Sequence, residues 1–383
     1  MKMLLSQRTI KTLKWIFLVF VSWRLSLVLI TLVGIELFPL REGFLGGGTL
    51  NYLKNPLFWS WANFDGVHYL IIAKQGYYQY QQAFFPFYPF LVRFVALIFK
   101  NYLFSGLLVS HLSLLAAIVL FYRLVRLDFE DKIAKRSIIY LLIFPTAFFL
   151  GSVYTESLFL ALVLATFFSA RKGNWVLAGL FGALASATRL VGVFLFPALI
   201  VEWYLAKTRN KKQKTRTVLP IFIILSGLLV YMWYLQKTVG DPLYFIHVQP
   251  FFGAQRTGGK LILLYQVFWR YLKMLITVQK WTPTYFAVIL ETISGAMFLL
   301  LIVFAYLRRW YSYLVFMAFA YLAPTLTGTL SSMPRYVLVL FPGFIILAEL
   351  EEKYRWLRIL YPAIAVLFTI ISVLFFTRGF WVA

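Results

Sequence analysis

The chain has 383 residues, a formal net charge of +24 and a mean hydropathy of +0.82, and 62% of its residues are hydrophobic against 13% charged. Soluble domains are nearer half apolar and a quarter charged, so this composition excludes a water-soluble enzyme, a disordered chain and a coiled coil. The absence of cysteine excludes disulfide frameworks, thiolate metal sites and a cysteine nucleophile, and three histidines argue against a His-rich metal site. The sequence therefore predicts a polytopic membrane protein.

Spanning helices need roughly 20 apolar residues, and eleven segments approach that length. We therefore expect an all-α integral membrane protein with about 11 transmembrane helices. In chain order these are Trp15–Phe38, Tyr102–Leu124, Ser137–Gly151, Thr155–Ala170, Asn174–Thr188, Leu190–Ala206, Thr217–Gln236, Thr284–Leu307, Tyr311–Leu330, Tyr336–Leu350 and Leu357–Phe376.

The short loops determine the expected orientation, because Lys and Arg are enriched on the cytoplasmic side. When the N-terminus is inside and the C-terminus outside, three basic groups fall on the cytoplasmic side of the membrane: Arg171–Lys172, Lys207–Arg216 and Arg308–Arg309. The high positive charge then reports topology, and we expect the lipid bilayer as a partner and no nucleic acid.

This orientation leaves two long segments outside the membrane, residues 39–101 and 237–283, within a single polytopic domain that covers residues 1–383. In the second, Lys260–Gln279 is expected to form a helix in the membrane interface, with Arg270 and Lys273 one turn apart amid aliphatics. In the first, Phe84–Lys100 contains two prolines and an arginine and is expected to be juxtamembrane or re-entrant rather than a twelfth span.

Most carboxylates predicted on the inner side, Glu202 and Glu351 among them, have Lys or Arg neighbours and are interpreted as a solvated charged face. Asp65 differs, since it stands alone among aromatics and is followed by a glycine. If a helix begins at Asp65, then His68 and Tyr69 lie on its side of that helix. The alternative role for Asp65 is a helix N-cap.

Four stretches carry a resemblance to a known family. The first stretch begins with Phe64-Asp65-Gly-Val-His68-Tyr69 and continues with Ile72-Ala73, Gly76-Tyr77 and Phe84-Phe-Pro-Phe-Tyr88-Pro89. The second is Val153–Phe159, and the third is Ala187-Thr-Arg189 with Gly192. The fourth is Pro334-Arg335-Tyr336 with Phe341-Pro342. Together they resemble the GPI mannosyltransferase II family of the C-type (GT-C) superfamily of polytopic glycosyltransferases, over residues 60 to 345. Phe64 departs from the family's usual Trp. The chain is also shorter than the eukaryotic enzymes and lacks their cysteines, which favours a prokaryotic relative, so the GPI-intermediate acceptor is not carried over.

The resemblance implies a hexosyltransferase, and a mannosyltransferase as first choice. Its donor would be a polyprenyl- or dolichyl-phosphate-linked sugar, and its acceptor a hydroxyl of a glycan, lipid or protein. Transfer would be inverting and on the extracytoplasmic side of the cell membrane, or of the endoplasmic reticulum membrane in a eukaryote. A lipid phosphate leaves without a general acid but needs positive charge to stabilise it, and the acceptor needs one carboxylate base. No cofactor is predicted, and a divalent metal is left open.

These requirements assign roles to individual residues. Asp65 is the expected catalytic base. The expected substrate-binding residues are His68, Tyr69, Tyr77, Tyr88, Glu156, Arg189, Arg335 and Tyr336, with the two arginines near the lipid phosphate. The structural alternatives are an interface histidine, a helix cap at Glu156, snorkelling arginines and an aromatic belt that includes Trp61. Glu291 lies inside a predicted span and is a candidate for which the sequence names no partner.

Two other classes of protein stay open at this point. A secondary transporter or a flippase of lipid-linked glycans would explain the short spans 174–188 and 190–206, although such breaks usually occur in both halves of a transporter and no second copy is found. A non-catalytic accessory subunit would not require Asp65. The sequence does not give the sugar, the acceptor or the oligomeric state.

Overall fold

The computed structural model describes residues 7–209, 218–252 and 261–383, and every regular element within these ranges is a helix. The predicted all-α class is therefore confirmed. Most of the basic loop predicted at Lys207–Arg216 lies outside the described residues.

Six of the described helical segments are long and apolar enough to cross a membrane. They are α1 (Gln7–Leu37), α6 (Tyr102–Val125), α10 (Leu195–Arg209) with the turn before it, α11 (Ile223–Thr238) with the turn before it, α14 (Pro283–Leu307) and α18 (Leu357–Thr377). A seventh arises if the segments Met333–Val339 and Pro342–Lys353, bent by 84° at their junction, count as one broken span. These include α16 (Met333–Tyr336) and α17 (Pro342–Lys353).

The expected number of eleven spans is not confirmed, because four of the predicted spans correspond to shorter helices. These are α7 (Asp131–Leu142), α8 (Glu156–Arg171), α9 (Trp175–Thr188) and α15 (Tyr311–Thr325). In α8 every residue except Phe168 and Arg171 is buried. An apolar run of this length serves a helix surrounded by protein as well as one surrounded by lipid, and hydropathy does not separate the two cases.

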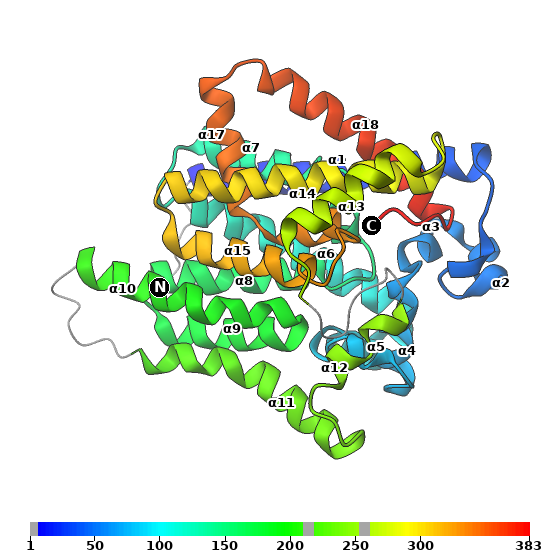
Figure 1. Ribbon diagram of the computed structural model, residues 1–383, viewed down its shortest axis with the longest axis horizontal. Coiled ribbons are helices and arrows are strands. Elements are labelled where there is room, and N and C mark those ends of the chain that lie inside the picture. Colours follow the sequence, from blue (N-terminus) through cyan, green and yellow to red (C-terminus); the bar gives the residue numbers. More distant parts are fainter. Residues whose placement is uncertain (1–6, 210–217, 253–260) are drawn as a thin grey trace.

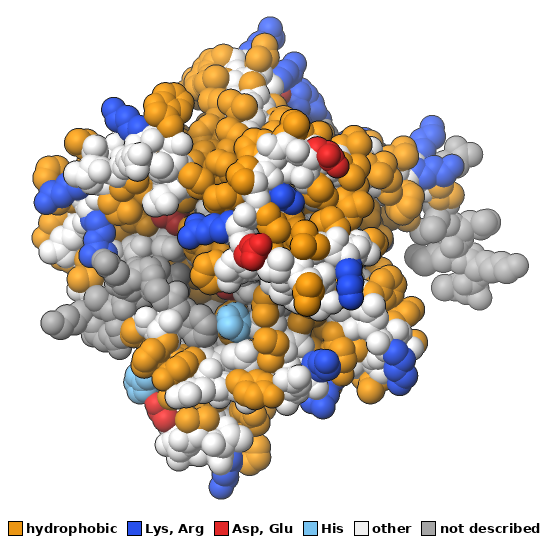
Figure 2. Space-filling view, turned by 90° about the vertical axis from the view of Figure 1, so that its right-hand side faces the viewer, with side chains coloured by type: hydrophobic (Ala, Val, Ile, Leu, Met, Phe, Trp, Pro, Cys, Tyr) orange, Lys and Arg blue, Asp and Glu red, His pale blue; other side chains and the backbone are white. Residues whose placement is uncertain are grey.

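The long helices lie side by side, with α8 packed between α6 and α9, and α9 in turn against α11 (Figure 1). The segment 39–101 folds into short helices at one end of this bundle: α2 (Gly48–Lys54), α3 (Pro56–Trp59), α4 (Asp65–Gln75) and α5 (Phe87–Phe99). Helix α12 (Tyr244–His247) lies at the same end. Apolar side chains cover much of this end, with lysines and arginines scattered among them (Figure 2).

Helix α13 (Leu264–Thr277) corresponds to the helix predicted at Lys260–Gln279. Its Val267 and Tyr271 are buried against the bundle, whereas Trp269 and Ile276 are 59% and 80% exposed. Such an amphipathic helix suits the boundary between a bilayer and water.

Candidate functional site

Asp65 is the first residue of α4, and the residue before it has an uncommon backbone conformation. Phe64 occupies the N-cap position with φ of +55°, a region that bulky residues rarely enter, and α4 has no side-chain cap. The Asp65 carboxylate instead accepts a hydrogen bond at 2.5 Å from Nη1 of Arg335, which is 270 positions further along the chain. The N-cap alternative for Asp65 is therefore not what the structure shows.

Buried hydrogen bonds fix the turn that leads into Asp65. Asn63 is completely buried; its Nδ2 donates to the Phe376 carbonyl at 2.9 Å, and its Oδ1 accepts from the Gly46 N–H at 2.7 Å. The Tyr154 hydroxyl donates to the Asn63 carbonyl at 2.9 Å. Since these contacts join distant segments of the chain, they set the position of Asp65 relative to the whole bundle.

Glu156 brings a second carboxylate to the same place, from the N-terminus of α8. It is 1% exposed, and its Oε1 lies 2.7 Å from Nη1 of Arg189 and 3.4 Å from Nε of Arg335. Arg189 is the C-cap residue of α9, and Arg335 lies in α16. Two carboxylates and two guanidiniums from four separate segments thus form one cluster: Asp65, Glu156, Arg189 and Arg335. We call it the outer cluster, after the side of the membrane that the sequence predicts for these residues.

Two polar atoms of the outer cluster have no hydrogen-bond partner within the part of the chain that is described. These are Oε2 of Glu156 and Nε of Arg335, and both are buried. A buried polar atom without a partner costs free energy, so such atoms are uncommon in folded proteins. The cluster therefore holds a carboxylate oxygen and a guanidinium N–H whose hydrogen bonds the described residues do not supply.

Aromatic rings support the two guanidiniums. The Tyr336 ring centroid lies 5.3 Å from the Arg189 guanidinium carbon and 5.6 Å from that of Arg335. Phe149 and Tyr154 lie 5.5 and 5.4 Å from Arg335. These cation–π contacts hold the two cations in place without neutralising them.

A sequence model of the mannosyltransferase (PIG-V) family matches residues 16–240 of the chain. The chain belongs to this family. The match includes Asp65, Glu156 and Arg189, and Arg335 lies beyond it. No curated protein matches the sequence significantly.

Three solved structures of the oligosaccharyltransferase of Archaeoglobus fulgidus are similar to this mannosyltransferase-family chain. The apo form is 13% identical with a TM-score of 0.41 and aligns over 95% of this chain and 56% of its own. A form tethered to an acceptor peptide is 12% identical with a TM-score of 0.40, over 94% and 55%. A complex with an inhibitory peptide and a dolichol-phosphate is 12% identical with a TM-score of 0.39, over 94% and 56%. The chain spans a little over half the length of these structures.

The histidine and tyrosine predicted beside Asp65 flank the outer cluster. His68 stacks on Phe84 with ring centroids 4.9 Å apart, and its Nδ1 lies 3.2 Å from Nε2 of Gln81. Burial lowers the pKa of His68, and the nearby Asp65 carboxylate partly opposes this shift. The pKa of the Tyr69 hydroxyl is raised by burial and by the Glu156 and Asp65 carboxylates.

Tyr77, Tyr88 and Trp61 instead have contacts within the protein. The Tyr77 hydroxyl donates to the Phe84 carbonyl at 2.7 Å. The Tyr88 ring is completely buried, and its hydroxyl lies 2.9 Å from the Ser110 hydroxyl. Trp61 is also completely buried, with the Arg24 guanidinium 4.2 Å from its ring centroid. Sugar stacking by these rings stays a prediction.

Sequence reasoning missed Asn63 and misjudged two of the carboxylates predicted on the inner side. Asn63 stands two residues before Asp65, but its side chain supports the loop through contacts with residues far along the chain, for which the sequence has no signal. Glu351 and Glu202 were interpreted as solvated, and that was wrong, since they are 2% and 5% exposed. The Tyr140 hydroxyl and the Arg358 Nε each donate to Glu351, at 2.6 and 2.7 Å.

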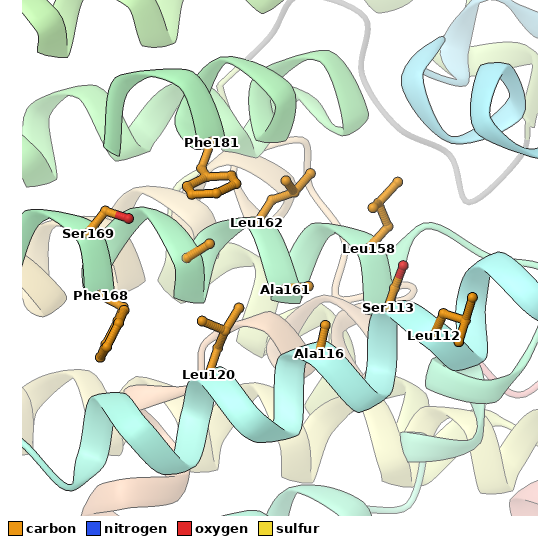
Figure 3. Close-up of a pocket in the computed structure, with 11 residues that line it drawn as sticks. Leu112, Ser113, Ala116, Leu120, Leu158, Ala161, Leu162, Phe168, Ser169 and Phe181 are labelled. Atoms are coloured by element: carbon orange, nitrogen blue, oxygen red, sulfur yellow. The ribbon is translucent and has the colours of Figure 1, made fainter. Parts of the chain in front are cut away.

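An apolar groove of about 420 Å³ lies elsewhere in this mannosyltransferase-family chain, between α6, α8 and α9 (Figure 3). Its floor includes Leu158, Ala161 and Ala165 of α8. At about 100° per residue, Leu158 and Ala165 lie roughly 160–180° around the helix from Glu156. The groove and the outer cluster are thus on opposite faces of α8.

Within the described ranges no three His, Asp or Glu side chains are grouped to hold a metal ion.

Proposed function

We propose that this chain is a membrane hexosyltransferase that moves a sugar, with mannose the first choice, from a polyprenyl- or dolichyl-phosphate donor to an acceptor hydroxyl, with inversion at the anomeric carbon. Membership of the mannosyltransferase family supports the reaction class. The observation that carries the proposal is the outer cluster, which places one partly accessible carboxylate beside the buried Arg335 and the partly buried Arg189.

In this proposal Asp65 is the base. Its side chain is 22% exposed, whereas that of Glu156 is 2% exposed, so Asp65 is the carboxylate that an acceptor can reach. Asp65 takes the proton of the acceptor hydroxyl as the oxygen attacks the anomeric carbon, and the bond from that carbon to the phosphate oxygen breaks on the opposite side. This geometry inverts the configuration and does not need the second, acidic carboxyl group of a glycosidase.

Arg335 and Arg189 receive the leaving phosphate in the same proposal. A guanidinium binds two oxygens through parallel N–H bonds, and the charge that develops on the phosphate is stabilised best by donors that are already in position. Glu156 holds the two guanidiniums together, and its unpartnered Oε2 is available to accept a hydrogen bond from a sugar hydroxyl.

The proposed function is tested by the product that the protein forms. Membranes that contain the wild-type chain are given radiolabelled polyprenyl-phosphate mannose, and the products are separated from the donor. We expect a new mannosylated acceptor that membranes with Asp65→Asn do not form. Donor that crosses the bilayer intact, with no transfer in either sample, would contradict the proposal and favour the flippase.

The proposed side of the reaction is tested separately. We propose that the Asp65 loop is extracytoplasmic, because the basic short loops favour a cytoplasmic position for the loop at 208–217. Single cysteines at Gln75 and Gln213 of this cysteine-free chain are exposed to a membrane-impermeant thiol reagent in intact cells. Labelling at position 75 but not at 213 is expected, and the reverse pattern would place the reaction inside the cell.

A further inference from the structure

Glu291 is a carboxylate inside α14 that the proposed chemistry does not use. It is 4% exposed, and its two oxygens contact different parts of the chain. Its Oε2 accepts from the Tyr271 hydroxyl at 2.7 Å, and its Oε1 accepts from the backbone N–H of Ser332 at 3.2 Å. A buried carboxylate in a membrane protein is costly, so its partners indicate what it does.

The contact with Ser332 occurs at the turn that carries Arg335. Ser332 is the N-cap of α16 and has φ of +65°, a conformation that is uncommon for residues other than glycine. Its carbonyl accepts from the N–H groups of Arg335 and Tyr336, each at 3.0 Å. The hydrogen bond from Ser332 to Glu291 therefore stabilises the backbone conformation from which the Arg335 side chain begins.

Helix α13 holds the same loop from the other side. Nη1 of Arg270 donates to the Gly328 carbonyl at 2.9 Å, and the Tyr271 hydroxyl lies 3.1 Å from the Thr329 hydroxyl. Glu291 is thus the point at which α13, α14 and the Arg335 turn are joined by hydrogen bonds.

We infer that Glu291 is a positioning residue: its carboxylate fixes the Ser332 turn and so holds the Arg335 guanidinium in the outer cluster. The link from Arg335 to phosphate binding rests on the proposed function, but the link from Glu291 to the Ser332 turn does not. The two links are measured by different experiments.

The first experiment measures the turn directly. A single cysteine at Ser331, next to the turn and only partly buried, is labelled with a small thiol reagent in detergent-solubilised protein. We expect Glu291→Leu to raise the labelling rate about tenfold, as the loss of one hydrogen bond to a charged group allows. Glu291→Gln keeps an acceptor for the Ser332 N–H and should label close to the wild-type rate.

Glu202→Leu is the matched control, because it removes another buried carboxylate that accepts from a hydroxyl, here Ser312 at 2.6 Å, at a distance from the turn. It should leave labelling at position 331 unchanged. An unchanged rate in Glu291→Leu, or an equal rise in Glu202→Leu, would overturn the inference. If Glu291→Leu does not accumulate, Glu291→Met, which is closer to the glutamate in shape, removes the same acceptor from the Ser332 N–H; the same rise is expected, and no rise would overturn the inference.

The second experiment measures the consequence for the donor. Glu291→Leu should raise the donor KM more than it lowers kcat. This effect should nearly vanish in an Arg335→Ala background, because both changes remove the same interaction of the Arg335 guanidinium with the donor. Fully additive effects would show that Glu291 acts elsewhere. If labelling responds as expected but Arg335→Ala leaves donor kinetics unchanged, the positioning role holds and the proposed function of Arg335 fails.

Discussion

Glu156 and Glu351 are two almost fully buried carboxylates, 1% and 2% exposed, and both contact arginines. At Glu351 each oxygen has a hydrogen bond, from the Tyr140 hydroxyl and from Nε of Arg358, and Nη1 of Arg136 lies 3.2 Å away. At Glu156, Oε1 contacts two arginines, whereas Oε2 has no partner within the part of the chain that is described.

We propose that this difference separates a structural ion-pair network from a binding site. Both oxygens of Glu351 accept hydrogen bonds, which stabilise the packing of α17 against α7 and leave no free acceptor for a ligand, although Nη1 of Arg136 has no hydrogen-bond partner within the described residues. An unpartnered buried acceptor, as at Oε2 of Glu156, is destabilising, and a ligand that donates a hydrogen bond to it would remove that cost. Burial and charge alone do not distinguish the two networks.

The largest expected effect is at Asp65. Asp65→Asn keeps the size of the side chain but removes the proton acceptor, so turnover should fall by about 10²–10⁴-fold. The measurement is initial transfer rate at saturating donor, with membrane insertion checked in parallel. Near-normal turnover in a correctly inserted variant would limit Asp65 to holding Arg335.

Arg335 should show the next largest effect. Arg335→Lys keeps the charge but loses the paired N–H groups, and donor use should fall by about 10- to 100-fold, the equivalent of one or two charged hydrogen bonds. Arg335→Ala should be worse, and acceptor KM should change less than donor KM in both. Variants with wild-type donor kinetics would exclude Arg335 from the phosphate site and move the test to Arg189.

A matched pair of substitutions tests the comparison itself. Glu351→Gln weakens the contacts with Arg358 and Arg136 and should lower the free energy of unfolding by about 1–3 kcal/mol with transfer unchanged. Glu156→Gln should lower transfer and change stability less, because one of its oxygens is already unpartnered. Thermal denaturation and transfer assays on both variants measure the two effects. If stability and transfer fall equally in the two variants, the distinction between the two clusters does not hold.

The smallest expected effect is the pH dependence from His68. Burial lowers its pKa below the usual 6.5, so the unfolded chain binds this proton more readily than the folded chain does. Stability should therefore decrease as the pH falls through 6.5, and His68→Asn should reduce that slope. Denaturation curves at pH 5 and 7.5 measure the change, and an identical slope in the variant would show that other groups control it.

Much of the outer cluster could be predicted from the sequence, because its residue types match what the chemistry requires and its motifs resemble a known family. The sequence predicts all four residues, Asp65, Glu156, Arg189 and Arg335, but it does not predict their contacts. Pairing between residues 65 and 335 depends on how the helices pack, and no local pattern encodes that. The support from Asn63 and the link from Glu291 to Ser332 were hidden for the same reason.

The helical class was also predictable, whereas the number of spans was not. Hydropathy reports that a segment avoids water, and α8 avoids water inside the protein. Glu351 and Glu202 were misjudged for a related reason, since a neighbouring Lys or Arg in the sequence does not show whether a carboxylate is solvated.

The burial of α8 has a consequence for how the chain enters the membrane. A helix of 16 residues is about 24 Å long and the hydrocarbon core is about 30 Å thick, so α8 is too short to stand alone in lipid. Its insertion must then be coupled to that of its neighbours α6 and α9, which cover its sides. The N-terminus of α8 carries Glu156, so both of its arginine partners are in place only once α8 has packed with the end of α9 and with α16.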